Sequence, residues 1–350
     1  MHHVATDTNW AVSEFADAEL GDERRTKRLV ELANVLGQHP TAALPEACGD
    51  GGMLKAAYRF FDHDAIDAQD MLQSHVESTY RRLDYASVVL AVQDTTEVHW
   101  TRHPATQGLG PLGHTALAFT PERVPLGLLA QQVWARDPND VGQRARRKHL
   151  PISQKESQQW LHSLDTVYTA RACCPTTRLV SVGDREADVY DVLAAARPEG
   201  VDLLLRAAWD RCVRGPEHSL WATVAAQPVV AHLLLTVPRR PQVARDATLA
   251  LRFCPVTRCP PRHRQREGWP AVTLWAVQVQ EIEPPRDVTP IEWLLLTTVA
   301  VETVDDAIER VQWYSCRWGR EVWHRILQSG CRIEERQLAS GERLPRCLTL

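Results

Sequence analysis

No hydrophobic run in this sequence is long enough to cross a membrane. The longest uncharged stretch, residues 222–238, is interrupted by Gln227, Pro228 and His232, whereas a membrane-spanning helix needs about 20 apolar residues in succession. The N-terminus also lacks the basic and apolar regions of a signal peptide. These two absences predict a soluble protein of the cytoplasm.

Cysteine, glycine and proline occur in numbers that exclude several protein classes. The nine cysteines have no Cys-x-x-Cys spacing, which argues against a disulfide framework or a zinc site. The 17 glycines and 22 prolines are too few for a disordered or collagen-like chain. A chain of 350 residues with 44% hydrophobic residues therefore predicts two globular domains, or one domain with a large insertion.

The sequence has no overall excess of positive charge, but its basic residues are clustered. The net charge is −4, yet residues 236–270 contain eight arginines and two acidic residues, a local charge of +6. Four further basic residues lie within residues 144–148. A solvated surface would explain either block alone, whereas two such blocks in an acidic chain favour a phosphate-rich partner.

The first 65 residues have a helical pattern. Asp22 can cap a helix whose apolar residues recur at helical spacing. The first turns of this helix carry four basic residues, although the helix dipole favours acids there. This placement suggests an anionic partner, and a plain surface helix is the alternative. A glycine-rich break at residues 49–52 precedes further helical sequence, and another helix is expected over about residues 67–83.

From residue 87 onward, short apolar runs predict a mixed α/β core. The expected order is three strands, a helix, a strand, a helix and a strand. Ser153 and Glu156 form a capping box at the start of the first of these helices, and the second is expected over residues 186–196. The strands are expected at residues 87–92, 115–119, 126–134, 179–182 and 201–205. Four later runs predict an inserted antiparallel layer within about residues 207–301, at 231–237, 248–253, 272–280 and 293–299. Thr303 and Asp306 form a capping box for a long final helix that reaches about residue 327.

Two aspartates lie at the ends of expected core strands. Asp94 follows the first strand, and Asp184 follows the strand at 179–182. Strand ends in α/β folds are common ligand sites. One such aspartate is more often a cap or turn residue, but two on neighbouring strands suggest a hard-cation site, because Mg²⁺ prefers oxygen ligands.

The last predicted helix carries a polar stripe. Tyr314, Arg317 and Glu321 are separated by three and four residues, so they share one helix face. An exposed Arg–Glu pair would explain part of this spacing. It would not explain why a third carboxylate accompanies the two strand-end aspartates.

Together these motifs resemble the DDE transposases of bacterial insertion sequences, in particular the insertion-sequence-four family, which includes the transposon-five transposase. The resemblance extends over residues 10–350. It depends on seven segments in order: residues 20–29, 57–60, 93–96, 155–157 with Trp160, 184–188, 293–297, and Tyr314-x-x-Arg-x-x-x-Glu321.

The resemblance implies a fold, a catalytic site and a set of DNA contacts. The fold is an RNase-H-like catalytic domain at residues 69–350, preceded by a helical domain at 1–68 that binds the transposon end. Asp94, Asp184 and Glu321 correspond to a catalytic triad that binds two Mg²⁺ ions, or Mn²⁺ in their place. The residues that correspond to family DNA contacts are Tyr314 and Arg317 at a phosphate beside an extruded base, Trp293 stacking on that base, Arg206 after its strand, and Arg25, Arg28 and Lys55 in the N-terminal region.

The implied activity is cut-and-paste transposition. In the family, one site nicks a DNA strand, forms a hairpin, reopens it and transfers the freed 3′-end to target DNA. The partners are therefore double-stranded DNA, as transposon terminal repeats and as target, and a second subunit in the paired complex. The expected location is cytoplasmic, in association with the bacterial nucleoid.

The chain departs from the family pattern in two places. Gln328 stands where the family signature has a lysine, which moves or weakens a phosphate contact, with Arg325 and Arg332 as candidate replacements. The C-terminal dimerisation region of the family is expected to be absent, since the sequence stops at Leu350. Two alternatives stay open: a truncated DNA-binding remnant that inhibits a full-length transposase, and a metal nuclease that only hydrolyses DNA.

Overall fold

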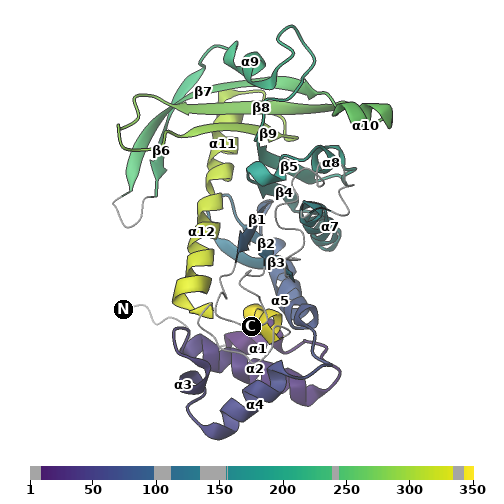
Figure 1. The fold of residues 1–350 in the computed structure, drawn as a ribbon, viewed down its shortest axis with the longest axis vertical. Coiled ribbons are helices and arrows are strands. Elements are labelled where there is room, and N and C mark those ends of the chain that lie inside the picture. The colour runs from purple at the N-terminus through teal and green to yellow at the C-terminus, as the bar shows by residue number, and fades with distance from the viewer. Residues whose placement is uncertain (1–8, 98–111, 135–154, 156, 239–243, 334–342) are drawn as a thin grey trace.

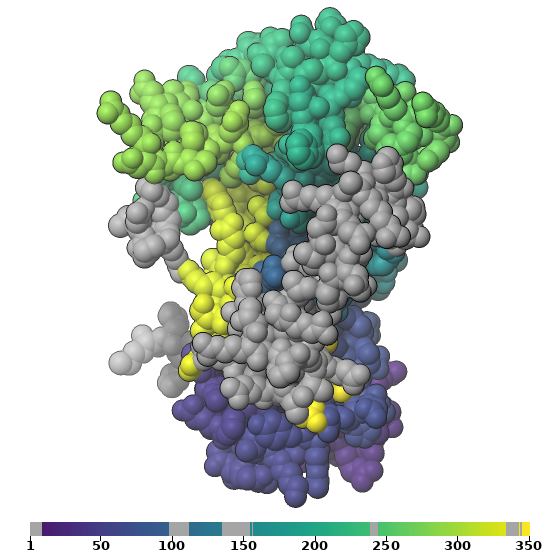
Figure 2. Space-filling model, viewed as in Figure 1, coloured from purple at the N-terminus to yellow at the C-terminus, as the bar shows by residue number. Residues whose placement is uncertain are grey.

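Helices of the N-terminal region and strands of a large sheet occupy opposite ends of the molecule (Figure 1). The structure, a computed structural model, describes residues 9–97, 112–134, 155, 157–238, 244–333 and 343–350. The space-filling view shows the same separation, with the N-terminal helices at one end and strands β7 and β8 at the other (Figure 2). The basic cluster at 144–148 and the capping box expected at Ser153 and Glu156 lie outside the described residues.

Side-chain caps define the N-terminal helices. Asp22 accepts a hydrogen bond from the backbone of Arg24, and Asp67 accepts one from Gln69, so both expected helix starts are confirmed. Asp50 caps a further helix from within the glycine-rich break. The five helices are α1 (Trp10–Phe15), α2 (Glu23–Gln38), α3 (Leu44–Cys48), α4 (Gly51–Phe61) and α5 (Ala68–Leu83).

Nine strands form one mixed sheet in the order β3-β2-β1-β4-β5-β9-β8-β7-β6. Its first half has the expected antiparallel meander, followed by two strands that run parallel to β1. These strands are β1 (Val88–Glu97), β2 (Leu112–Phe119), β3 (Pro125–Trp134), β4 (Arg178–Gly183) and β5 (Val201–Arg206). Helix α7 (Gln158–Cys173) connects β3 to β4.

The second half of the sheet is antiparallel, as expected, but it is not a separate layer. Strand β9 pairs with β5, so the later strands extend the core sheet edge to edge. These strands are β6 (Ala231–Val237), β7 (Arg245–Arg258), β8 (Val272–Glu281) and β9 (Glu292–Thr297). The short helices α9 (Leu220–Ala225) and α10 (Arg262–Arg266) flank them.

Helices cover both faces of the sheet. Trp160, Leu164 and Val167 of α7 pack in one buried cluster with alternate residues of β1, β4 and β5. The other residues of the same strands pack against Val311 and Trp313 of α11 (Val304–Ser315). The alternation of strand side chains therefore builds two cores, one on each face.

The structure corrects two helix predictions. The helix expected over 186–196 is a 3-10 turn (Arg185–Ala187) followed by α8 (Tyr190–Ala194), because Asp188 bonds to Arg258 and to the backbone of Ala208 instead of facing solvent. The final helix begins at the predicted Thr303 capping box but divides at Cys316. It continues as α12 (Arg317–Arg325) and a π-helical turn (Ile326–Gly330).

Both ends of the described chain attach to the helical region. In α13 (Arg343–Thr349), Cys347 is buried in the cluster formed by α1 to α5. Glu14 of α1 accepts hydrogen bonds from His75 Nδ1 and Arg82 Nη1 of α5, each at 2.6 Å. Arg82 also donates to the carbonyl of Leu126 in β3. One carboxylate therefore ties the first helix to the helix that abuts the sheet.

Glu14 makes the stability of this junction depend on pH. Burial would raise its pKa, but the hydrogen bonds from His75 and Arg82 outweigh burial and lower the pKa from 4.5 to about 2. A carboxyl group with a depressed folded-state pKa stabilises the fold above its unfolded pKa and loses that contribution as the pH falls through the folded value. We expect Glu14→Gln to lower the free energy of unfolding by about 2 kcal/mol at pH 7, and by progressively less between about pH 4.5 and pH 2.

Urea unfolding of the two proteins across this pH range measures the difference. Glu19→Gln, which changes an exposed carboxylate in the following segment, is the matched control and should unfold like the parent chain. A difference between Glu14→Gln and the parent that does not change with pH would contradict the prediction.

Candidate active site

Parallel pairing of β1 and β4 brings two aspartates to one edge of the sheet. Val92 pairs with Val182, and Asp94 and Asp184 each follow two residues later. Side chains alternate along a strand, and Val92 and Val182 face the core on the α11 side. The two aspartates therefore continue the same face. Asp184 directly follows β4, as expected, whereas Asp94 lies inside β1 instead of after it, because pairing with β2 extends β1 to Glu97.

A glycine immediately before Asp184 permits this arrangement. A Cβ atom on Gly183 would lie 2.5 Å from the Cβ of Ala187, 2.9 Å from the Trp160 ring and 3.0 Å from Leu205. All three neighbours belong to the buried core. Only glycine lets the chain turn out of β4 so close to α7 and β5, and that turn positions the Asp184 carboxylate.

Two arginines of α12 contact the aspartates. Arg317 Nη2 lies 3.4 Å from Asp94 Oδ1 and 3.4 Å from Asp184 Oδ2, so one guanidinium bridges both carboxylates. Arg320 forms a direct ion pair with the second oxygen of Asp94. A Cβ atom on Gly319 would meet the Phe119 ring at 2.9 Å, so glycine there lets α12 come close enough for these contacts.

Burial strengthens the contact between Arg320 and Asp94. The Arg320 side chain is 12% exposed and that of Asp94 is 6% exposed. Burial lowers the pKa of the Arg320 guanidinium to about 10, so the group keeps its charge at neutral pH. A buried charge pair of this kind is costly to break from one side, because the remaining partner is left without a counter-ion.

The described ion pair of Glu321 is with Arg320 and not with the arginine that bridges the two aspartates. The Glu321 side chain is 57% exposed, and its Oε1 is 3.8 Å from Arg320 Nη2. Arg320 therefore connects Glu321 to Asp94. Within the ranges that the structure describes, no three histidine, cysteine, aspartate or glutamate side chains are grouped closely enough to hold a metal ion. The metal role of the three carboxylates stays a prediction.

Tyr314, Arg206 and Trp293 gather beside this site. Burial raises the pKa of the Tyr314 hydroxyl, and the nearby charges of Arg317 and Arg206 partly offset that effect. The ring of Trp293 is 4.9 Å from that of Tyr314 and 5.7 Å from that of Trp318. Trp293 is only 7% exposed, so aromatic neighbours enclose the side chain that was expected to stack on a base. Its stacking role stays a prediction.

The other expected DNA contacts are distributed over the molecule. Arg25 donates to the carbonyl of Leu20, and Arg28 pairs with Glu31 at 2.7 Å. Lys55 is exposed on α4. Gln328 Nε2 is 3.4 Å from the carbonyl oxygen of Glu97, the last residue of β1.

Several arginines of the basic stretch at 236–270 have internal partners. Arg245 pairs with Glu281, Arg258 with Asp188 and Arg264 with Asp191. These three charges stabilise the protein and are not free for phosphate. The stretch is therefore less basic at the surface than the sequence suggested, although Arg262 and Arg266 of α10 are exposed.

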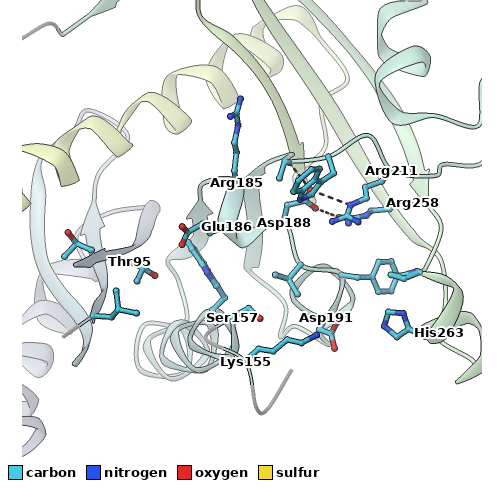
Figure 3. A pocket seen from close by; sticks show the side chains of 18 of the residues that line it. Thr95, Lys155, Ser157, Arg185, Glu186, Asp188, Asp191, Arg211, Arg258 and His263 are labelled. Carbon is cyan, nitrogen blue, oxygen red and sulfur yellow. Dashed lines mark hydrogen bonds and ion pairs between the residues drawn. The ribbon is translucent and has the colours of Figure 1, made fainter. Parts of the chain in front are cut away.

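A cavity of about 1030 Å³ begins where the two aspartate-bearing strands end. Its lining includes Thr95 and Thr96, directly after Asp94, and Arg185 and Glu186, directly after Asp184. Figure 3 shows Thr95 at one side of this cavity and Arg211 and Arg258 converging on Asp188 at the other. Neither this cavity nor the contact of Arg320 with Asp94 was predicted from the sequence. The signal for Arg320 was its charge and its place directly before Glu321 in the chain.

Residues 7–66 match a family model described as transposase DNA-binding. Helices α1 to α4 therefore belong to a transposase DNA-binding domain, which supports a transposase-type, DNA-processing protein with DNA as a partner. None of the described helices combines the length and the apolar composition required to span a membrane.

The contacts around Gly183 predict a large effect of one added methyl group. Gly183→Ala should destabilise the fold by about 1 to 3 kcal/mol, because buried overpacking forces its neighbours to move. It should also displace Asp184 from Arg317. Gly113→Ala on β2, another strand of the same sheet, is the matched control, since the nearest atom to its Cβ would be 3.9 Å away. Thermal unfolding of both variants measures the effect, and equal stability of the two would contradict this account of Gly183.

Proposed function

We propose that this chain, which carries a transposase DNA-binding domain at residues 7–66, is a DDE transposase that cuts and joins DNA at transposon ends. The observation that supports the proposal most directly is the convergence of Asp94 and Asp184 on one cationic group, just beyond the point where the pairing of β1 with β4 ends. Two carboxylates close enough to share the Arg317 guanidinium could also share a metal ion that promotes phosphodiester cleavage. The adjoining domain would bind the DNA.

The sheet supports the proposed catalytic domain. An antiparallel meander of three strands is followed by two strands parallel to the first, with helices on both faces. This arrangement agrees with the RNase-H-like core that the resemblance implies. We retain residues 1–68 as the domain that binds the transposon end and residues 69–350 as the catalytic domain, with β6 to β9 as its insertion.

Asp94 and Asp184 have the chemistry to hold divalent cations. Their carboxylate oxygens are hard ligands of the kind that Mg²⁺ and Mn²⁺ prefer. The positively charged Arg317 guanidinium lies between them, where a metal ion would bind. Glu321 is the proposed third ligand. Two bound Mg²⁺ ions would make a water or a 3′-hydroxyl nucleophilic and stabilise the departing oxygen.

In this proposal, the arginines of α12 neutralise the aspartates when no metal ion is bound and contact DNA when one is. With a cation held by the carboxylates, Arg317 would be free to bind a DNA phosphate beside the buried Tyr314. Arg320 is both a neighbour of Glu321 and the counter-ion of Asp94. The approach of a divalent cation therefore requires these side chains to move, which couples cation binding to phosphate binding.

The complete proposed reaction is cut-and-paste transposition. One site would nick a strand, form a hairpin, reopen it and transfer the 3′-end to target DNA, within a paired complex of two subunits at the nucleoid. The open alternatives give different products. A nuclease would leave nicks or breaks without hairpins, and a DNA-binding remnant would leave the DNA intact.

Substitution of the carboxylates tests this function. Asp94→Asn, Asp184→Asn and Glu321→Gln should each reduce Mg²⁺-dependent cleavage by at least about a hundredfold, since each removes one ligand charge. Binding of DNA should change little, because the contacts that position DNA lie elsewhere. The substrate is linear DNA that spans the coding sequence and its flanks, analysed on denaturing gels that separate nicks from hairpins.

Asp165→Asn, which alters an exposed carboxylate on α7, is the matched control and should cleave normally. If cleavage persists in Asp94→Asn or Asp184→Asn, the catalytic assignment is wrong. If the parent chain produces nicks but no hairpin, the simple nuclease is the better description.

The ion pair of Arg320 predicts an effect on cation affinity that needs no cleavage assay. Arg320→Gln removes a charge that competes for Asp94, so we expect Mn²⁺ to bind about tenfold more tightly, as measured by electron paramagnetic resonance of free Mn²⁺. Arg325→Gln removes the same charge further along α12 and should have a much smaller effect. An unchanged or weaker affinity in Arg320→Gln would contradict competition between Arg320 and the cation.

A further inference from the structure

The loop after β5 presents an exposed tryptophan to the cavity beside the aspartates. Trp209 is 64% exposed although its side chain lines that cavity. It follows Arg206, the last residue of β5, by three positions. An exposed indole at the edge of a polar cavity is available to stack on a flat ring from outside the protein.

The backbone on both sides of Trp209 is fixed. The N–H of Ala207 donates to the carbonyl of Leu294 at 2.8 Å, and the N–H of Ala208 donates to Asp188 Oδ2 at 2.9 Å. On the other side, Asp210 accepts hydrogen bonds from the Ser219 hydroxyl at 2.6 Å and the Trp221 backbone at 3.0 Å. These bonds fix the backbone that carries Trp209 before any ligand arrives, which lowers the cost of ordering the loop on binding.

Asp188 organises the cationic side of the same cavity. It is buried and pairs with Arg258 at 2.6 Å, a contact that compensates its charge. Arg211 lies at 3.9 Å from the other Asp188 oxygen and stays 39% exposed. Figure 3 shows both arginines reaching Asp188 from one side of the cavity. One buried carboxylate therefore positions the Trp209 loop and orients the exposed guanidinium of Arg211.

Further cations belong to the lining of the same cavity. They are Lys155, which extends toward Asp191 in Figure 3, and Arg185, which directly follows Asp184. Acidic residues line the cavity as well, but Asp191 is paired with Arg264, Glu97 is the last residue of β1 and Glu186 lies two residues after Asp184. Trp209 and these cations therefore share one cavity beside the aspartates.

We propose that this cavity binds an unpaired segment of a DNA strand, with one base stacked on Trp209 and its phosphates at Arg211, Arg185 and Lys155. Aromatic stacking with a cationic path is how proteins hold single strands without reading sequence. The volume of about 1030 Å³ is at the upper limit of small-ligand pockets, which suits a segment of strand. The proposal deepens the proposed function, because the cavity would hold the strand that separates next to the cleaved bond.

Binding without divalent cations tests the site separately from catalysis. Two DNA duplexes of equal length are compared by fluorescence anisotropy, one blunt and one with an unpaired thymine arm. We expect the parent chain to bind the forked DNA about tenfold more tightly, and Trp209→Ala to remove that preference while its affinity for the blunt duplex is unchanged. Trp209→Phe should retain most of the preference, because a phenyl ring also stacks.

Trp221→Ala is the matched control. Trp221 is another exposed tryptophan, on α9, and it does not belong to the cavity lining, so its removal should leave the fork preference intact. Asp188→Asn tests the positioning role of Asp188. It should weaken forked binding, and thermal unfolding shows whether that loss reflects a changed loop or a destabilised fold.

A 2-aminopurine in the unpaired arm reports where the base lies. Its fluorescence should be quenched on binding to the parent chain and restored in Trp209→Ala. Equal affinity of the parent chain for forked and blunt DNA, or quenching that survives Trp209→Ala, would overturn the proposal. A chain that binds forked DNA through Trp209 but never cleaves DNA with Mg²⁺ would instead retain this site and refute the proposed function.

Discussion

The parallel pairing of β1 with β4 is the constraint on which the candidate site depends. Parallel strands end at the same edge of a sheet, so residues 90 positions apart in the chain meet there. The register makes Asp94 and Asp184 equivalent positions on one face, two residues beyond Val92 and Val182. A register shift of one residue would send either aspartate to the opposite face, toward α7. The connection through α7, which makes β4 parallel to β1, and Gly183, which lets the chain turn after β4, both place Asp184 beside Asp94.

Two neighbouring carboxylates repel each other, and burial makes their negative charges more unfavourable. Helix α12 compensates these charges. Asp94 is almost fully buried, and an unpaired charge there would be strongly unfavourable. Arg317 and Arg320 supply the opposite charge, and Gly319 between them lets the helix approach Phe119. A cation that displaces these arginines must compensate the aspartates at least as well, which favours a divalent ion over a monovalent one.

Local signals predicted much of this structure. The caps at Asp22, Asp67 and Thr303 depend on side chains within three residues of the backbone groups they bind, so sequence alone reveals them. The two aspartates were identified because each follows a short run of apolar residues that predicts a buried strand. The DNA-binding role of the N-terminal region followed from the resemblance and agrees with the match at residues 7–66.

The failures of prediction arose where distant residues decide the local conformation. Asp188 appeared to continue a helix, but Arg258 bonds to it from 70 residues away and ends the 3-10 turn. The basic stretch at 236–270 suggested a phosphate-binding surface, whereas Asp188, Asp191 and Glu281 neutralise three of its arginines. Helical spacing indicated that Arg317 faces the aspartates, but it did not reveal that Arg320 pairs with Asp94 and lies 3.8 Å from Glu321.

The attachment of the helical domain determines how DNA could reach the aspartates. Glu14 joins α1 to α5, Arg82 of α5 bonds to the carbonyl of Leu126, and β3 belongs to the same meander as β1. From the other end of the chain, Arg346 of α13 donates to the carbonyl of Phe61 at the end of α4. These contacts hold α5 against β3 and α13 against α4. Under the proposed function, they connect the domain that binds DNA to the sheet that carries Asp94, so bound DNA would approach the aspartates from the side of the N-terminal helices.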